Sequence, residues 1–239
     1  MNMIQKLNYN ISQSEKYGWG PDWFDCETFG EDLIHSIIEF QKEHGLDADG
    51  LCGPSTYRRK WTEREADGDY NEERIIPQGK KYIVSNGRPV VINWDKVVLW
   101  NQPGGLIAKP GTYTDKTAHI PRDIRYMVLH WDAALSSKSC ARILRKRGLS
   151  CTFCIDNDGT IFQLMDTQHV AWCNGSKHNG KSIGVEVSNA VYEKWNPWYE
   201  RNGFGKRPIM RGKMVHGKFL KPFLGFYPIQ LEALAALME

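Results

Sequence analysis

The sequence contains no run of about 18 consecutive apolar residues, the length that a membrane-spanning helix requires. The segment from Met1 to Gly20 also lacks the apolar stretch that forms the centre of a secretory signal peptide. We therefore expect no membrane insertion, and we expect the chain to be made and folded in a cytoplasm without a signal peptide.

Cysteine and net charge are both sparse. Six cysteines among 239 residues are too few for a dense disulfide scaffold, and a net charge of +3 is too small to indicate a nucleic-acid partner. Cys151 and Cys154 have a C-x-x-C spacing but lie in an apolar run that predicts a strand. Because residues three apart on a strand point to opposite faces, we do not expect these thiols to share a metal ion. A zinc or redox protein that depends on its cysteines is therefore the weakest interpretation.

Aromatic residues, in contrast, are abundant and include nine Trp. Trp and Tyr offer flat amphipathic surfaces that suit sugar binding, although they also fill cores and line clefts. The remaining composition, 41% hydrophobic and 25% charged, is that of an ordinary globular protein.

Residues 1–65 predict a small helical module. Apolar residues recur at helical spacing over residues 31–44, and a glycine follows as a C-cap. A tight polar turn over residues 46–54 leads into a second helix, which begins near residue 54 or 55 and runs through residue 61. Phe40 and Leu46 are expected to lie in the core of this module.

Residues 66–120 predict a linker and a connecting hairpin. Acidic side chains dominate residues 63–74, where apolar residues are few, as is typical of a solvated linker. Two short apolar runs, residues 82–84 and 89–92, flank Asn86-Gly87. This dipeptide favours a hairpin turn because both residues tolerate positive φ.

Residues 121–239 predict a mixed α/β domain, so the fold class is α/β: a small helical module plus a mixed β-sheet flanked by helices. Expected strands cover residues 125–131, 153–155, 160–164 and 182–188, and expected helices cover residues 136–147 and 228–239. In the last helix, the residues expected to line one face are Leu231, Leu234, Ala235 and Met238.

Two residues of this domain are candidates for chemistry. His130 lies near the end of the strand 125–131, and Glu186 lies in the strand 182–188, on the face opposite its Ile and Val side chains. A carboxylate in the middle of a strand is costly to desolvate unless it has a partner or a chemical role. We expect His130 and Glu186 to converge from neighbouring positions of one sheet face.

The first module carries the pattern F-Q, G-L, D-G-hydrophobic and G-P-x-T between Phe40 and Thr56. This pattern resembles the peptidoglycan-binding domain type 1 family over about residues 25–61, which implies bacterial peptidoglycan as the partner. An EF-hand interpretation of Asp47 and Asp49 fails, because the later oxygen ligands and the final Glu of such a loop are missing.

The second domain contains V-L-H ending at His130, F-x-I-D-x-D-G at residues 153–159, A-W-x-x-G at residues 171–175 and S-I-G-V-E ending at Glu186. In this order the motifs resemble the zinc-dependent N-acetylmuramoyl-L-alanine amidases of the amidase type 2 family, which include bacteriophage endolysins. The resemblance implies that Zn²⁺ activates water to cleave the bond between N-acetylmuramic acid and L-alanine. His130 would be the first zinc ligand, and Glu186 the catalytic acid and base. The residues expected to contact the substrate are Trp131, Trp172, Asn174 and Asn189.

The sequence departs from the family pattern in three places. Cys173 stands where the family often has His, and it is either a soft ligand or a buried thiol. Trp131 and Asp132 follow the first His, where the family often has His or Thr. The family's remaining zinc ligands and a catalytic Lys follow the last helix, whereas this chain ends at Glu239. We therefore expect the domain to be incomplete at its C-terminus, and one His cannot hold a catalytic zinc, which needs three protein ligands.

Two functions remain open. One is a peptidoglycan hydrolase, an endolysin that acts at the bacterial wall after release from the host cytoplasm, or a virion-associated enzyme of the same activity. The other is a non-catalytic peptidoglycan-binding or virion structural protein that keeps the amidase fold. The segment 201–221 contains seven Lys or Arg and no acidic residue, and it is either simply solvated or in contact with an anionic wall polymer.

Overall fold

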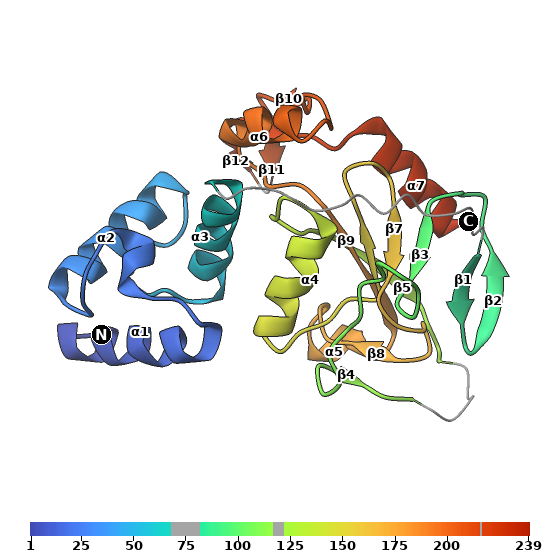
Figure 1. Cartoon of the computed structure of the whole chain (residues 1–239), viewed down its shortest axis with the longest axis horizontal. Helices are drawn as coiled ribbons and strands as arrows, with labels where there is room; N and C mark the ends of the chain where they lie inside the picture. Colours follow the sequence, from blue (N-terminus) through green and yellow to red (C-terminus); the bar gives the residue numbers. More distant parts are fainter. Residues whose placement is uncertain (68–81, 117–121, 216) are drawn as a thin grey trace. The chain divides into compact units, whose positions relative to one another are not determined.

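The computed structural model describes residues 1–67, 82–116, 122–215 and 217–239 (Figure 1). The chain divides into two compact units, Met1–Asp69 and Tyr70–Glu239. Most of the expected acidic linker lies outside the described residues, and the domain limits at residues 65 and 120 stay a prediction. No helix in the described part of the chain is long and apolar enough to cross a membrane.

The first unit is helical. Its elements are α1 (Met3–Tyr17), the 3-10 turn η1 (Pro21–Phe24), α2 (Glu31–Glu43) and α3 (Pro54–Asp67). Helix α1 begins with a capping box in which Asn2 and Gln5 exchange hydrogen bonds. Helix α3 runs past residue 61, where the sequence pattern predicted its end. The pattern missed the last turns because they are polar and carry no apolar periodicity.

Aromatic side chains fill the core of the first unit around the apolar face of α2. Phe40 is buried there, as predicted, whereas Leu46 is only half-buried, because the chain has already left the helix at this point. The buried Gln41 side chain holds the turn that follows α2. Its Oε1 accepts a hydrogen bond from the Gly50 amide at 2.8 Å, and its Nε2 donates to the Leu51 carbonyl at 3.1 Å.

The second unit is built on a five-stranded mixed sheet, which confirms the predicted α/β class. The strand order is β3 (Val97–Leu99), β7 (Ile161–Gln163), β6 (Phe153–Ile155), β9 (Ser182–Val187) and β5 (Tyr126–Trp131). All neighbouring pairs are parallel except β6 with β7, which form an antiparallel hairpin from two of the expected strands.

In the described part of the second unit, four two-stranded ladders and four α-helices accompany this sheet. The ladders are β1 (Tyr82–Ser85) with β2 (Arg88–Val91), β4 (Tyr113–Thr114) with β8 (Val170–Ala171), β10 (Ile209–Met210) with β13 (Phe223–Leu224), and β11 (Met214–Val215) with β12 (Lys218–Phe219). The helices are α4 (Ser137–Lys146), α5 (Ser176–Asn179), α6 (Asn196–Arg201) and α7 (Pro228–Met238), with a 3-10 turn η2 (Glu193–Trp195) before α6. The Asn86-Gly87 hairpin turn is confirmed, with φ of 51° and 74° at the two residues.

Helices α4 and α7 cover opposite faces of the sheet (Figure 1). The α7 face is the main hydrophobic core, in which Phe153, Ile155, Val185 and Val187 pack with Ala233 and Leu237. The predicted apolar face of α7 was wrong for Leu231 and Met238, which are 50% and 59% exposed, and right for Leu234, which packs against the core. Ala233 and Leu237 are the residues that face the sheet. Helix α4 lies within the expected range 136–147 and is capped by Ser136, whose hydroxyl accepts from the Ser139 amide.

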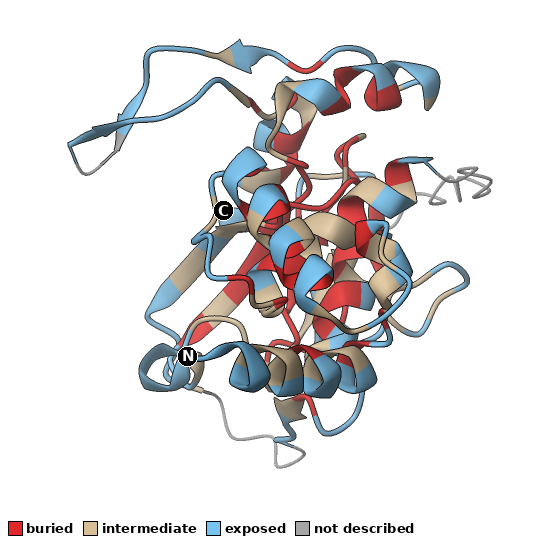
Figure 2. Cartoon of the chain, turned by 90° about the vertical axis from the view of Figure 1, so that its left-hand side faces the viewer, coloured by how far each residue is buried: buried red, intermediate tan, exposed pale blue. Residues whose placement is uncertain are grey.

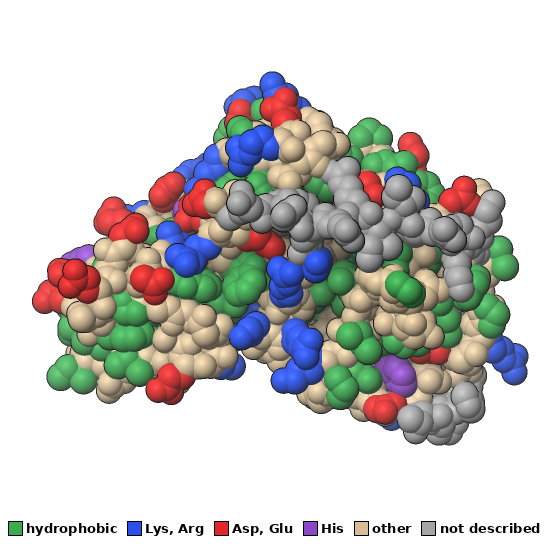
Figure 3. Space-filling view, viewed as in Figure 1, with side chains coloured by type: hydrophobic (Ala, Val, Ile, Leu, Met, Phe, Trp, Pro, Cys, Tyr) green, Lys and Arg blue, Asp and Glu red, His purple; other side chains and the backbone are tan. Residues whose placement is uncertain are grey.

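Helix α4 presents a basic face to solvent. Its exposed residues include Lys138, Arg142, Arg145 and Lys146, and Lys and Arg side chains gather over this helix in Figure 3. Figure 2 shows in contrast that buried residues concentrate in the interior, while the β11–β12 segment is exposed.

The basic segment 201–221 is not uniformly solvated. Arg207 is 2% exposed, which corrects the expectation that this segment is only a basic surface loop. Its guanidinium packs against the rings of Tyr199 and Tyr227, whose centroids are 4.4 and 4.2 Å away. Arg207 is thus a core residue of the second unit, where it donates hydrogen bonds to buried backbone carbonyls.

Candidate functional site

The sheet register brings His130 and Glu186 together. Strands β5 and β9 are adjacent and parallel, and His130 is directly paired with Glu186. Directly paired residues project from the same side of a sheet, so the imidazole and the carboxylate lie side by side. On the other side of β9, Glu186 is paired with Cys154. The face that carries this pair is the one that α4 covers.

A short chain of hydrogen bonds orients the His130 ring. The Ser182 hydroxyl donates to the His178 carbonyl, so its oxygen accepts from Asn174 Nδ2 at 2.7 Å. Asn174 therefore turns Oδ1 toward His130 Nε2, which lies 2.7 Å away and must donate. In the neutral ring, Nδ1 is then the nitrogen with a free lone pair.

Asp132 is a second buried carboxyl beside Glu186, and no chemical role was predicted for it. Its Oδ1 accepts hydrogen bonds from the amides of Ala134 and Asn189, at 3.0 and 2.9 Å, and its Oδ2 accepts from the Ser188 hydroxyl at 3.0 Å. Burial raises the pKa of Asp132 to about 8, and the negative charge of Glu186 contributes in the same direction. The sequence contains one signal of this buried carboxyl: Asp132 is an acidic residue within the otherwise apolar run that follows His130.

Four cysteines lie around Glu186 on this face. Cys151 and Cys154 have their Sγ atoms 3.4 Å apart, so the expectation that they point to opposite faces was wrong. The reason is that β6 begins only at Phe153, and strand alternation does not apply to Cys151. Cys173 packs against Gly184, where any Cβ would clash with its Sγ. Burial raises the pKa of the Cys173 thiol, which favours the buried-thiol interpretation over a thiolate ligand.

The structure brings only part of the predicted substrate-binding set to this pair. Asn174 contacts His130, and Trp172 is half-buried after β8, where its Nε1 donates to Thr114. Trp131 projects from the opposite face of β5 and packs against Phe223, because neighbouring residues of a strand alternate.

Asn189 is also withdrawn from the pair. It is fully buried, its Nδ2 donates to the carbonyls of Leu224 and Gly225, and its Oδ1 accepts from the Val191 amide. The structure therefore gives Asn189 a position that anchors the chain after β9 and offers no accessible surface to a substrate.

The described residues do not supply a complete catalytic zinc site at His130. A catalytic zinc usually has three protein ligands and one open position. Among residues 1–67, 82–116, 122–215 and 217–239, the one cluster of three suitable side chains is Glu43, His44 and Glu63, which belongs to the first unit. His130 therefore fits a zinc ligand in type, but the described chain places no further ligand set beside it.

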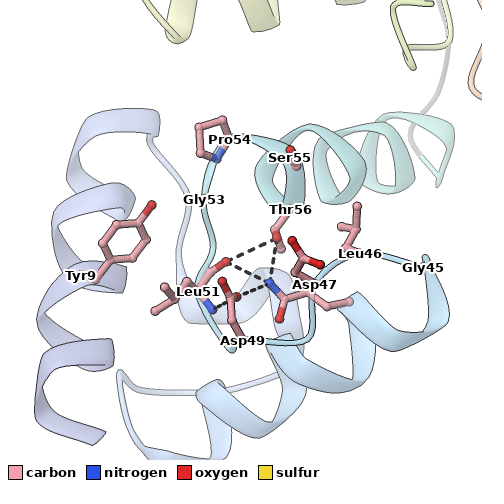
Figure 4. A pocket seen from close by; sticks show the side chains of 11 residues that line it. Tyr9, Gly45, Leu46, Asp47, Asp49, Leu51, Gly53, Pro54, Ser55 and Thr56 are labelled. Carbon is pink, nitrogen blue, oxygen red and sulfur yellow. Dashed lines mark hydrogen bonds between the residues drawn. The ribbon is translucent and has the colours of Figure 1, made fainter. Parts of the chain in front are cut away.

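The first unit contains a pocket at the turn between α2 and α3 (Figure 4). Its volume is about 420 Å³. The residues that line it are Tyr9, Gln41, Gly45, Leu46, Asp47, Asp49, Leu51, Gly53, Pro54, Ser55 and Thr56. Polar oxygens from Asp47, Ser55 and Thr56 and the ring of Tyr9 converge on it, a combination that suits a polar ligand with an apolar face.

One stability prediction follows from Asp132. Because burial raises its pKa above the ordinary 3.8 to about 8, the protonated form is favoured by folding. Its contribution is complete below pH about 4 and is lost as the pH rises toward 8. Buried Asp156 behaves similarly, but its pKa is raised only to about 6. The free energy of unfolding should therefore fall between pH 6 and 8 in the wild type, and this fall should be absent in Asp132→Asn.

Urea unfolding at pH 6, 7 and 8 measures this difference. Asp156→Asn is the matched control, because it should change the pH dependence below pH 6 and leave the slope between pH 6 and 8 intact. An Asp132→Asn protein with the wild-type slope in this window would show that the Asp132 carboxyl is ionised throughout.

Comparison with known families agrees with this geometry. The profile of the family Amidase_2, described as N-acetylmuramoyl-L-alanine amidase, matches residues 120–239. No individual curated protein matches the chain. The matched region includes His130, Glu186 and the whole five-stranded sheet except β3. Because the match covers half of the 239 residues, the chain belongs to the Amidase_2 family of N-acetylmuramoyl-L-alanine amidases.

Proposed function

We propose that the chain hydrolyses the amide bond between N-acetylmuramic acid and L-alanine in bacterial peptidoglycan, with Glu186 as the general acid and base. The observation that carries this proposal is the direct pairing of His130 with Glu186 on one face of the sheet, in a domain of the amidase family. A carboxylate that is only 4% exposed is shielded from bulk water, which strengthens its interactions with a reacting group.

In the proposed reaction, Glu186 accepts a proton from the attacking water molecule as the water oxygen bonds to the amide carbonyl carbon. Glu186 then returns the proton to the nitrogen as the carbon–nitrogen bond breaks. The products are a lactyl carboxylate on the sugar and a free α-amino group on L-alanine. His130, held by Asn174, lies beside the carboxylate and contributes a fixed polar group to the site.

The described residues account for only part of a zinc site. When bound, zinc would polarise the amide carbonyl and activate water, and His130 is the residue that would bind it. Because the described residues hold no group of three metal ligands that includes His130, Glu186 carries the steps above without the metal.

The test of the activity uses purified peptidoglycan and the full chain. Release of new L-alanine amino termini is measured by labelling of free amines and mass spectrometry, with and without added Zn²⁺. Appearance of N-terminal L-alanine supports the proposal, and its absence under both conditions contradicts it. An endolysin setting, with release to the wall from the host cytoplasm or delivery by a virion, rests on the family resemblance alone. Lysis of host cells from within would test it.

We further propose that the first unit binds peptidoglycan through the pocket of Figure 4. The side chains of Asp47 and Tyr9 line this pocket and are separate from the Gln41 hydrogen bonds that hold its turn together. Combined replacement, Tyr9→Ala with Asp47→Ala, should weaken co-sedimentation with insoluble peptidoglycan by about tenfold, since each lost contact is worth roughly 0.5–1.5 kcal/mol. Asp32→Ala, on the exposed side of α2, is the matched control and should bind normally. Equal binding by all three proteins would place wall recognition elsewhere.

A non-catalytic wall-binding or virion structural role is the second candidate. It is favoured by one observation: the described residues beside His130 do not complete a zinc site. This role predicts that the chain co-sediments with peptidoglycan but releases no L-alanine amino termini with or without Zn²⁺.

A further inference from the structure

The first unit contains a cluster of metal-ligating side chains that the amidase chemistry does not use. Glu43 is the last residue of α2, His44 is the C-cap of that helix, and Glu63 lies on α3. One ligand atom from each residue, an imidazole nitrogen and two carboxylate oxygens, lies within 4.8 Å of the other two. The cluster thus joins the end of one helix to the middle of the next.

The hydrogen bonds of His44 determine which ring nitrogen faces the cluster. Nδ1 lies 2.8 Å from the Phe40 carbonyl oxygen, which can only accept, so Nδ1 carries a proton. Nε2 lies 3.3 Å from Oε1 of Glu63. In the neutral ring Nε2 is then the nitrogen whose lone pair can bind a metal ion. Metal-binding histidines commonly donate their other nitrogen to a backbone carbonyl in this way.

The spacing of the two atoms suits a small transition-metal ion. Zinc binds nitrogen and oxygen ligands at about 2.0–2.2 Å, so neighbouring ligands of a tetrahedral site lie about 3.3–3.6 Å apart. The 3.3 Å between His44 Nε2 and Glu63 Oε1 falls in this range. An imidazole with two carboxylates is a donor set that first-row divalent ions accept.

The local charge also favours a cation at this position. The carbonyl groups at the end of α2 add the negative end of the helix dipole to the two carboxylates. Lys60 and Lys42 are cations of the same cavity, and Lys60 Nζ lies 3.1 Å from Oε2 of Glu63 while Lys42 pairs with Glu39. Lys60 therefore approaches the other oxygen of this carboxylate, and Oε1 remains turned toward His44.

A path to solvent exists on one side of the cluster. The His44 side chain is only 2% exposed. Glu43 and Glu63, in contrast, line a solvent-filled cavity of about 730 Å³. An ion could enter from this cavity, bind the two carboxylates and the buried imidazole, and retain water as its remaining ligand.

We propose that Glu43, His44 and Glu63 bind a divalent first-row transition-metal ion, with Zn²⁺ as the reference ion. The ion links α2 to α3 and stabilises the first unit against unfolding, since it binds the folded arrangement and not the unfolded chain. This site lies in the first unit and does not include His130 or Glu186.

The test is calorimetric titration of the metal-free full chain with Zn²⁺. It is carried out in the wild type and in a His130→Ala background, so that zinc bound in the second unit is recognised separately. Glu43→Gln and Glu63→Gln should each raise the dissociation constant of one Zn²⁺ at least about tenfold. Glu39→Gln is the matched control, because Glu39 lies on α2, lines the same cavity and pairs with Lys42 instead.

Two further measurements keep the result independent of folding. Glu43 is exposed, so its substitution should leave the circular dichroism spectrum unchanged while zinc affinity falls. In ¹⁵N spectra of the imidazole, Zn²⁺ should shift the Nε2 signal of His44 and leave Nδ1 protonated. Equal zinc affinity in the Glu39, Glu43 and Glu63 variants would contradict the proposal, as would an unshifted Nε2 signal at saturating Zn²⁺. Either result would mean that the cluster contains only an ion pair between His44 and Glu63.

Discussion

Glu186→Gln is expected to lower the release of L-alanine amino termini from peptidoglycan by about 10²–10⁴-fold, the usual contribution of general acid–base catalysis. The amide of Gln has nearly the shape of the carboxylate but cannot accept a proton from water. Shape matters here, because Glu186 is 4% exposed and packs beside Asp132 and the buried thiols. The expected result is therefore a loss of turnover with the fold preserved.

The matched control is Glu232→Gln, an exposed glutamate on α7 in the same unit, which should retain full activity. Co-sedimentation of Glu186→Gln with peptidoglycan should equal that of the wild type, since the proposed wall-binding pocket lies in the first unit. Undiminished amine release by Glu186→Gln would remove this residue from the mechanism.

The sequence predicted the face that Glu186 takes on β9, because its neighbours Val185 and Val187 are apolar and alternate with it. The direct pairing with His130 also needs β5 and β9 to be adjacent in register, which the sheet topology supplies and no local pattern encodes. Strand alternation excludes Trp131 from that face, since it directly follows His130, and a stricter use of alternation would have removed it from the substrate-binding set. The hydrogen bond from Asn174 to His130 joins residues far apart in the chain, and no local pattern encodes it.

Other features were not predictable from periodicity. Helix α7 is apolar nearly all the way round, so spacing alone could not select the face that meets the sheet. Cys151 precedes its strand by two residues, and the exact start of a strand is the least certain part of any sequence pattern. Helix α1 was not predicted, because it is polar and lacks a strong apolar stripe, although Asn2 and Gln5 form its capping box.

The burial of Arg207 was the least expected result, because a basic segment usually indicates solvent. The guanidinium packs against both Tyr199 and Tyr227 and donates to four oxygens. Nη1 donates to the Gly225 carbonyl at 3.1 Å and to Gln230 Oε1 at 3.0 Å, while Nη2 donates to the Ser188 carbonyl at 2.8 Å and to Asn157 Oδ1. These acceptors come from the end of β9, the β6–β7 turn, the start of α7 and the segment before it. One side chain therefore connects four parts of the second unit.

Arg207→Met is expected to destabilise the second unit by about 1–3 kcal/mol, the cost of leaving a buried polar group without its hydrogen-bond partner. Methionine fills much of the same volume but removes the donor to Asn157 Oδ1, whereas the other three acceptors keep donors from Asn189, Gln230 and Tyr227. Urea unfolding followed by Trp fluorescence measures the loss. The neighbouring Lys206→Met is the control, because the Lys206 side chain is 71% exposed and its ion pair with Glu200 contributes little. A loss below about 1 kcal/mol in Arg207→Met would mean that water reaches these oxygens. In that case Arg207 would be a solvated cation, and the link from β9 to α7 would depend on Gln230 alone.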